Sequence, residues 1–141
     1  MEVRMEHTEG LGGPAEVWVN GFPLTVCDSV SDPQKRCPPG VLQGVRFGYM
    51  TAEKVSWDQA AGENPSKKKM LDPVHRWSYV GYGRVVSIMP VVIDFGLLRM
   101  EDANWTSDES LVGKFVKVPI DRLEIAPANL RDYPENPSAG T

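Results

Sequence analysis

Hydrophobic and polar residues alternate with a period of two over several short stretches of the chain, which predicts β-strands. The clearest example runs from Glu16 to Val26, where two apolar stretches flank Asn20-Gly21. Because Asn-Gly readily adopts the positive φ angles of a type I′ turn, we expect a β-hairpin here. Pro23 cannot donate a hydrogen bond, so the second strand of this hairpin is expected at a sheet edge or at a bulge.

Further strand patterns follow later in the chain, over residues 45–50, 79–88, 91–98, 115–120 and 123–125. Gly81 and Gly83 share one face of the strand expected over 79–88, which is typical of a sharp bend or of the close approach of another backbone. Ser56 and Thr106 each begin a sequence with capping-box spacing, so each predicts a short helical turn.

These elements predict a mainly β protein of five or six strands with one or two short helical turns. The 13 glycines and 12 prolines support many turns and disfavour long helices. We expect a small barrel, preferably the five-stranded, partly open barrel of the oligonucleotide/oligosaccharide-binding (OB) type. An SH3-like barrel or a small sandwich are the alternatives.

A chain of 141 residues is long enough for one domain, and two cores of half that size would each be marginal. Residues 1–13 contain three glycines and no periodicity, so they are expected to form a flexible tail. Residues 127–141 are rich in proline and asparagine, and we expect a second flexible tail there. The folded domain is therefore expected over residues 14–126.

Residues suited to catalysis or metal binding are few. Of the two histidines, His7 lies in the expected tail and His75 precedes a cation, so neither is expected to act as a general base. No glycine-rich phosphate-binding motif occurs. Cys27 and Cys37 are too few to close a zinc site and are interpreted as reduced thiols, with a disulfide as the alternative. We therefore expect no enzymatic activity, no cofactor and no metal.

The chain is acidic, with a formal net charge of −4. An acidic protein repels nucleic acid and anionic membranes unless a local basic patch opposes the net charge. No apolar segment approaches the ~20 residues of a membrane-spanning helix, and the first residues do not resemble a secretory signal. We expect no membrane contact and a cytoplasmic location.

Residues 40–90 differ from the rest of the chain in charge and aromatic content. They hold seven Lys and Arg residues against four Asp and Glu, and six of the twelve aromatic residues. Cations contact phosphates and exposed rings stack on unpaired bases, while Trp, Tyr and Arg also dominate protein interfaces. The candidate binding residues in this stretch are Trp57, Lys67, Lys68, Lys69, Arg76 and Trp77.

The sequence thus predicts a non-catalytic binding domain. A protein-interaction module, for example a subunit, an adaptor or an inhibitor, is the favoured interpretation, because the acidic net charge suits a protein partner better than a polyanion. Weak binding of single-stranded nucleic acid through residues 40–90 is the alternative, and the basic, aromatic middle of the chain favours it.

Overall fold

Strands dominate the computed structural model, which describes residues 1–128. The mainly β prediction is confirmed. The strands are β1 (Val3–Thr8), β2 (Pro14–Val19), β3 (Phe22–Asp28), β4 (Gly40–Leu42), β5 (Val45–Met50), β6 (Met70–His75), β7 (Ser78–Ile88), β8 (Val91–Asp94), β9 (Arg99–Asp102), β10 (Phe115–Ile120) and β11 (Arg122–Pro127). The helices are α1 (Trp57–Gly62) and the 3-10 helix η1 (Glu109–Leu111).

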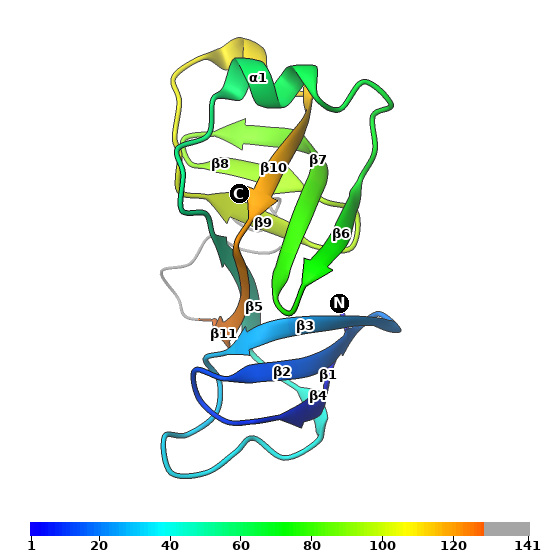
Figure 1. Cartoon of the computed structure of the whole chain (residues 1–141), viewed down its shortest axis with the longest axis vertical. Helices are drawn as coiled ribbons and strands as arrows, with labels where there is room; N and C mark the ends of the chain where they lie inside the picture. Colours follow the sequence, from blue (N-terminus) through cyan, green and yellow to red (C-terminus); the bar gives the residue numbers. More distant parts are fainter. Residues whose placement is uncertain (129–141) are drawn as a thin grey trace.

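The strands form two sheets, one in the lower and one in the upper half of the molecule (Figure 1). The lower sheet has the order β4-β1-β2-β3-β11-β5, and only its β3–β11 pair is parallel. The upper sheet has the order β10-β7-β8-β9, with β6 also paired to β7. The expected number of five or six strands is wrong, because β4 and β9 are too short, β1 is too polar and β6 lacks the alternation that would reveal it.

Strand β1 occupies part of the segment expected to be a tail. It pairs with β2 and β4, and its Val3 and Met5 side chains are buried. The expectation of a flexible tail over residues 1–13 is therefore wrong for β1, since two apolar side chains among charged neighbours gave no sign of their burial. The second expected tail, over residues 127–141, lies outside the described residues from 129 onward, and Pro127 ends β11.

The hairpin predicted around Asn20-Gly21 is confirmed. Strands β2 and β3 pair up to Val19 and Phe22, and the two turn residues have φ angles of 48° and 86°. Strand β11 pairs with β3 only at Cys27 and Asp28, the last two residues of β3. Pro23 therefore has a neighbouring strand on one side only, as its missing N–H requires.

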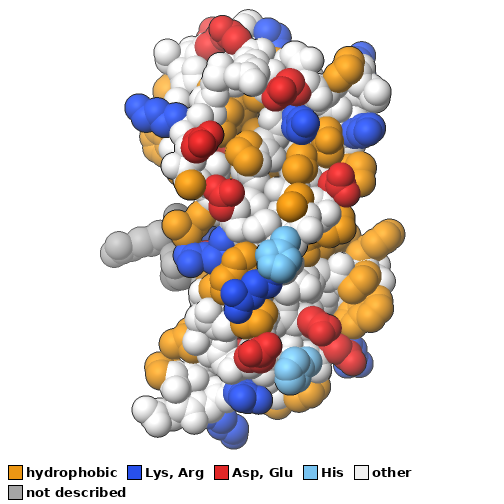
Figure 2. All heavy atoms as spheres, in the orientation of Figure 1, with side chains coloured by type: hydrophobic (Ala, Val, Ile, Leu, Met, Phe, Trp, Pro, Cys, Tyr) orange, Lys and Arg blue, Asp and Glu red, His pale blue; other side chains and the backbone are white. Residues whose placement is uncertain are grey.

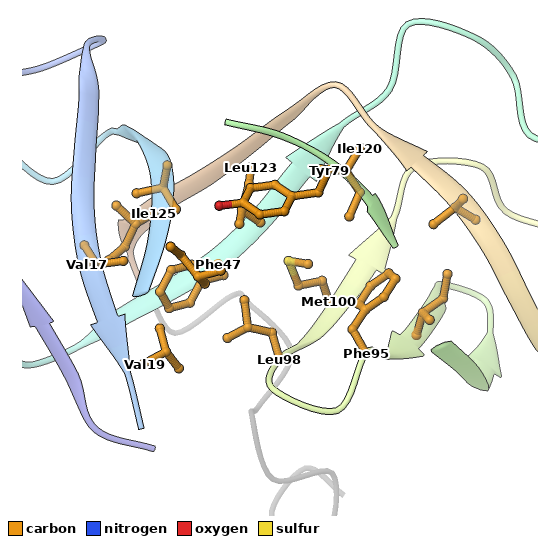
Figure 3. Close-up of a cluster of buried hydrophobic side chains, with 14 of the residues drawn as sticks. Val17, Val19, Phe47, Tyr79, Phe95, Leu98, Met100, Ile120, Leu123 and Ile125 are labelled. Atoms are coloured by element: carbon orange, nitrogen blue, oxygen red, sulfur yellow. The ribbon is translucent and has the colours of Figure 1, made fainter. Parts of the chain in front are cut away.

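One hydrophobic cluster joins the two sheets. Strands β10 and β11 are separated only by Asp121, so the chain passes directly from the upper sheet into the lower one (Figure 1). Ile120 and Leu123 flank this passage and are buried with Phe95 and Met100 between the sheets (Figure 3). Burial of this cluster fixes how the two sheets lie against each other.

Both helical turns expected from capping spacing are present. The Ser56 hydroxyl caps α1 by accepting a hydrogen bond from the backbone N–H of Gln59. The cap of η1 is Asp108, two residues after the expected Thr106, and its carboxylate accepts from the backbone N–H of Ser110 at 3.0 Å. Among residues 1–128, neither helix is long and apolar enough to cross a membrane.

Gly81 and Gly83 lie where β7 approaches its neighbours closely, as their spacing predicts. A Cβ atom on Gly81 would lie 2.5 Å from the Phe95 ring, and one on Gly83 would lie 2.5 Å from the backbone oxygen of Asp94. Neither position has room for a side chain without movement of the surrounding structure. These two glycines therefore set the distance between β7 and β8 and between β7 and the core.

A hydrogen bond to a buried carboxylate links strand β5, at one edge of the lower sheet, to β9 of the upper sheet. The Tyr49 hydroxyl donates a hydrogen bond to the carboxylate of Asp102, which is fully buried. Asp102 also accepts from the backbone and the side-chain amide of Asn104, at 2.7 and 2.8 Å. The Tyr49 ring meets Phe95 edge to face, with the ring centroids 5.9 Å apart.

Replacing Tyr49 with phenylalanine is expected to reduce the free energy of unfolding by about 2 kcal/mol, because a buried charged acceptor loses a donor. The ring contact with Phe95 is kept, so the change isolates the hydroxyl group. Chemical denaturation measures the difference. Tyr82→Phe, which removes a hydroxyl from a half-buried ring on the outer face of β7, is the matched control and is expected to change stability by less than about 0.5 kcal/mol. Equal effects of the two changes would contradict the role of Tyr49.

Candidate functional surfaces

The six candidate residues from the sequence do not form one surface. Lys67–Lys69 precede β6, whereas Arg76 and Trp77 follow it. A six-residue strand spans about 20 Å, so these two groups lie at opposite ends of β6. Trp57 lies apart from both groups, at the start of α1.

The Trp57 side chain packs against the hydrophobic core. Its ring is half-buried against the hydrophobic core, and its indole N–H donates to the backbone oxygen of Asn104 at 3.0 Å. This hydrogen bond ties α1 to the loop after β9. A ring held in this way has its polar group satisfied and is not free to stack on a ligand.

The three lysines surround the start of β6. The Lys68 ammonium lies over the Tyr82 ring, 5.2 Å from its centroid, and Lys69 Nζ lies 3.4 Å from an Asp94 carboxylate oxygen. The Asn64 side chain holds this loop by bonding both the N–H and the C=O of Lys68. The loop is therefore ordered by specific contacts and presents Lys68 to the outer face of β7.

Arg76 and Trp77 form the turn between β6 and β7. The Arg76 guanidinium stacks on the Trp77 ring, with its central carbon 4.2 Å from the ring centroid. The Trp77 backbone oxygen accepts from the N–H of Leu123, which fixes the turn against β11. The Tyr79 hydroxyl accepts from the N–H of Thr25 at 2.9 Å and donates to its C=O, so the turn also abuts β3.

The β6–β7 turn therefore lies against β3 near Thr25 and against β11, away from the end of the β2–β3 hairpin at Asn20-Gly21. Large apolar side chains are exposed on both hairpins. Trp18 is 38% exposed, and Phe22 and Val74 are each 64% exposed. In Figure 2, hydrophobic side chains gather at the right-hand edge of the molecule, at the level where the β2–β3 hairpin projects. The register pairs Phe22 with the buried Val19 and Trp18 with Pro23, so Phe22 and Trp18 lie on opposite faces near the end of this hairpin. We call the exposed residues at this end the hairpin surface: Arg4, Trp18 and Phe22.

Charges around the hairpin surface are mixed. Arg4 lies beside Trp18 on the outer side of the lower sheet, and the next outward pair brings His7 opposite Glu16. Figure 2 shows the same mixture of blue, red and pale-blue side chains over the lower sheet. A surface of this kind combines exposed aromatic rings with charges of both signs and lacks the uniform positive charge that a polyanion requires.

A second surface lies on the outer face of the upper sheet. The inward residues of β7 and β10 are buried, so the residues between them face outward. The register places Phe115 opposite Arg84 and Lys117 opposite Tyr82, so that rings and cations alternate in both directions. Figure 2 views this face, and its upper half shows apolar side chains with basic and acidic side chains among them. We call these residues the basic face: Lys68, Tyr82, Arg84, Phe115 and Lys117.

The thiols are poorly placed for nucleophilic chemistry. Cys27 and Cys37 are free. Burial raises the pKa of Cys27 above its ordinary value, and burial together with the nearby Asp28 carboxylate raises the pKa of Cys37. Both side chains are therefore held as thiols at neutral pH, and a thiol is a much weaker nucleophile than a thiolate. Within residues 1–128, no three His, Cys, Asp or Glu side chains gather in a way that would hold a metal ion.

Residues that the sequence did not single out make up much of both surfaces. Trp18 and Phe22 fit a strand pattern, and nothing in that pattern distinguishes an exposed ring from a buried one. Tyr82 and Arg84 alternate with Gly81 and Gly83 along β7. Because the two glycines lie on the inward face, this alternation indicates that Tyr82 and Arg84 lie on the outward face. Lys117 joins them only through the pairing of β10 with β7.

Comparison of the chain with models of known protein families, with curated proteins and with solved structures finds no match.

Proposed function

We propose that this protein is a non-catalytic binding domain that recognises another protein through the hairpin surface. The observation that carries the proposal is the exposure of Trp18 and Phe22 at the end of the β2–β3 hairpin. Exposed aromatic rings grouped with an arginine supply most of the binding energy in protein interfaces. Removing such apolar area from water on binding is favourable, and its grouping at one place is typical of an interaction site.

The electrostatic surroundings of the hairpin surface favour a protein over a polyanion. Glu16 lies on the same side of the lower sheet as Arg4 and His7, so the local charge is close to balanced. Trp18 and Phe22 are held in the paired strands β2 and β3, which reduces the entropy lost when a partner binds. A surface ordered before binding suits a specific partner.

For the fold, we propose that the lower sheet is a barrel of the OB type. Its first and last strands, β4 and β5, are consecutive in sequence and are separated by only two residues. The N–H of Ala128, after β11, donates to the backbone oxygen of Gly44 between them at 2.7 Å. In such barrels the face of the second and third strands is the usual ligand surface, and Trp18 belongs to that face by analogy. An experimental structure with β4 and β5 as separate free edges would contradict this proposal.

The protein-binding proposal is tested with a double variant, Trp18→Ala with Phe22→Ala. The tagged wild-type protein, purified from its native source, is expected to recover a partner in stoichiometric amount. Against that partner in purified form, the double variant is expected to bind about 30-fold more weakly by titration calorimetry, which corresponds to about 2 kcal/mol.

Trp105→Ala is the matched control, because Trp105 is 62% exposed but lies in the loop after β9, away from the hairpin surface. It is expected to bind the partner like the wild type. Recovery of no stoichiometric protein, or equal weakening by Trp105→Ala, would count against the hairpin surface as the binding site. Thermal unfolding of all three proteins checks that each is folded.

A further inference from the structure

We propose that the basic face binds single-stranded nucleic acid, with its two rings stacking on bases and its cations contacting phosphates. This surface is separate from the hairpin surface, and the proposal does not depend on a protein partner. The basic, aromatic composition of residues 40–90 favours the same ligand. Of the six candidate residues in that stretch, however, only Lys68 belongs to the basic face.

The arrangement of rings and cations is the first observation. Tyr82 and Arg84 alternate with buried residues along β7, and Phe115 and Lys117 do the same along β10. Paired side chains of adjacent strands lie about 5 Å apart, so each ring has a cation beside it on the neighbouring strand. Lys68 adds a third cation directly over the Tyr82 ring.

The charge of this face is the second observation. The strand register places two carboxylates on this face: Asp94, opposite Arg84 on β8, and Asp72 on β6. Asp94 is engaged by Lys69 at 3.4 Å and by Arg99 at 4.0 Å, so its charge is compensated. With Asp94 compensated, the three cations Lys68, Arg84 and Lys117 outnumber Asp72, so the face is cationic in a chain whose net charge is −4. The acidic remainder of the protein repels a polyanion at long range, and binding is accordingly expected to be weak and to require low salt.

The rings select a single strand over a duplex. Tyr82 and Phe115 are half-buried within the sheet surface and do not project as wedges. Bases of a duplex are stacked inside it and cannot reach such rings, whereas unpaired bases can lie flat on Phe115 and, once the Lys68 ammonium moves from the Tyr82 ring to a phosphate, on Tyr82. A sheet with aromatic side chains on its outer face is a known platform for this kind of stacking.

Fluorescence anisotropy with a labelled oligothymidylate of about 15 nucleotides tests the proposal, since this length exceeds the site expected on one small domain. If Lys68, Arg84 and Lys117 each contact one phosphate, affinity is expected to fall roughly 20-fold between about 50 and about 200 mM salt. Lys117→Gln is expected to reduce the slope of log affinity against log salt by about 0.7.

Tyr82→Leu tests stacking while keeping an apolar side chain on β7, and it is expected to weaken binding about 10-fold. Lys35→Gln removes an exposed lysine from the loop between β3 and β4 and is expected to bind like the wild type. The proposal is overturned if the oligonucleotide gives no salt-dependent signal, if Tyr82→Leu binds as tightly as the wild type, or if a duplex of the same length binds equally well. Failure here leaves the protein-partner result unaffected, because the variants lie on different sheets.

Discussion

Replacing Gly83 with alanine is expected to destabilise the protein by about 3 kcal/mol, near the upper end of what overpacking usually costs. The added Cβ would lie 2.5 Å from the backbone oxygen of Asp94 and 2.6 Å from an Ile93 methyl group. Backbone atoms of β8 cannot move aside without breaking the β7–β8 hydrogen bonds. The midpoint of thermal unfolding is expected to fall by roughly 10 °C.

Two further glycine variants show whether the effect comes from this contact. Gly81→Ala would place its Cβ near the side chains of Phe95 and Ile120, which can partly rearrange, so it is expected to cost less than Gly83→Ala. Gly62→Ala is the matched control, because a Cβ at Gly62, the last residue of α1, meets nothing within 4 Å. It is expected to be neutral or to stabilise by up to about 1 kcal/mol. Similar losses at Gly62 and Gly83 would contradict the close approach of β7 and β8.

Replacing Asp28 with asparagine is expected to cost about 3 kcal/mol, because a fully buried carboxylate loses its role as an acceptor on both oxygens. One oxygen accepts from the N–H groups of Val30 and Ser31, both at 2.8 Å. The other accepts from the hydroxyl groups of Thr8 and Ser31. In asparagine, one of these two acceptor oxygens is replaced by an NH₂ group, which would face groups that also donate hydrogen bonds. Asp72→Asn, on exposed strand β6, is the control and is expected to change stability by less than about 0.5 kcal/mol.

The same carboxylate predicts how stability depends on pH. Burial is the largest single influence and raises the pKa of Asp28, but the hydrogen bonds from Ser31, Thr8 and Val30 together hold that pKa below its ordinary value. As pH falls, the unfolded chain therefore takes up this proton before the folded one does. The stabilisation is complete above the ordinary pKa of about 4 and is lost as pH drops through the lower folded value.

Unfolding in urea at neutral pH and in steps below about pH 4 measures this contribution. The wild type is expected to lose more stability over that range than Asp28→Asn, which has no proton to gain at this position. Parallel pH profiles for the two proteins would show that Asp28 is not responsible. Thr8→Val, which removes one of the hydroxyl donors, is expected to give an intermediate profile.

Local sequence signals identified the elements that depend on neighbouring residues. Asn20-Gly21 specified a hairpin, because only a few residue types adopt positive φ at low cost. Ser56 specified the start of α1, because its hydroxyl satisfies a free N–H at the helix terminus. Gly81 and Gly83 indicated a close approach before the neighbouring strand was known. Each of these outcomes is decided within a few residues of the chain.

Other features depended on partners that are distant in sequence. Strand β1 has only two apolar positions among charged ones, and it is a strand because β2 and β4 offer it hydrogen bonds on both sides. Strand β6 is exposed along almost its whole length and contains a proline, and it pairs with β7 along one edge only. The alternation that reveals a half-buried strand is missing where one edge and both faces meet water.

The candidate surfaces also depended partly on local sequence and partly on contacts between residues distant in sequence. The sequence established that the middle of the chain is basic and aromatic, since composition does not depend on folding. Which of those side chains share a face depended on strand register, which placed Lys117 beside Tyr82 and left Arg76 at the far end of β6. Burial of the core residues around Phe95 and Ile120 sets that register, because a shift by one residue would turn every inward side chain to solvent. Residue types and turns were thus determined locally, while the grouping of side chains into surfaces was determined by packing of the two sheets.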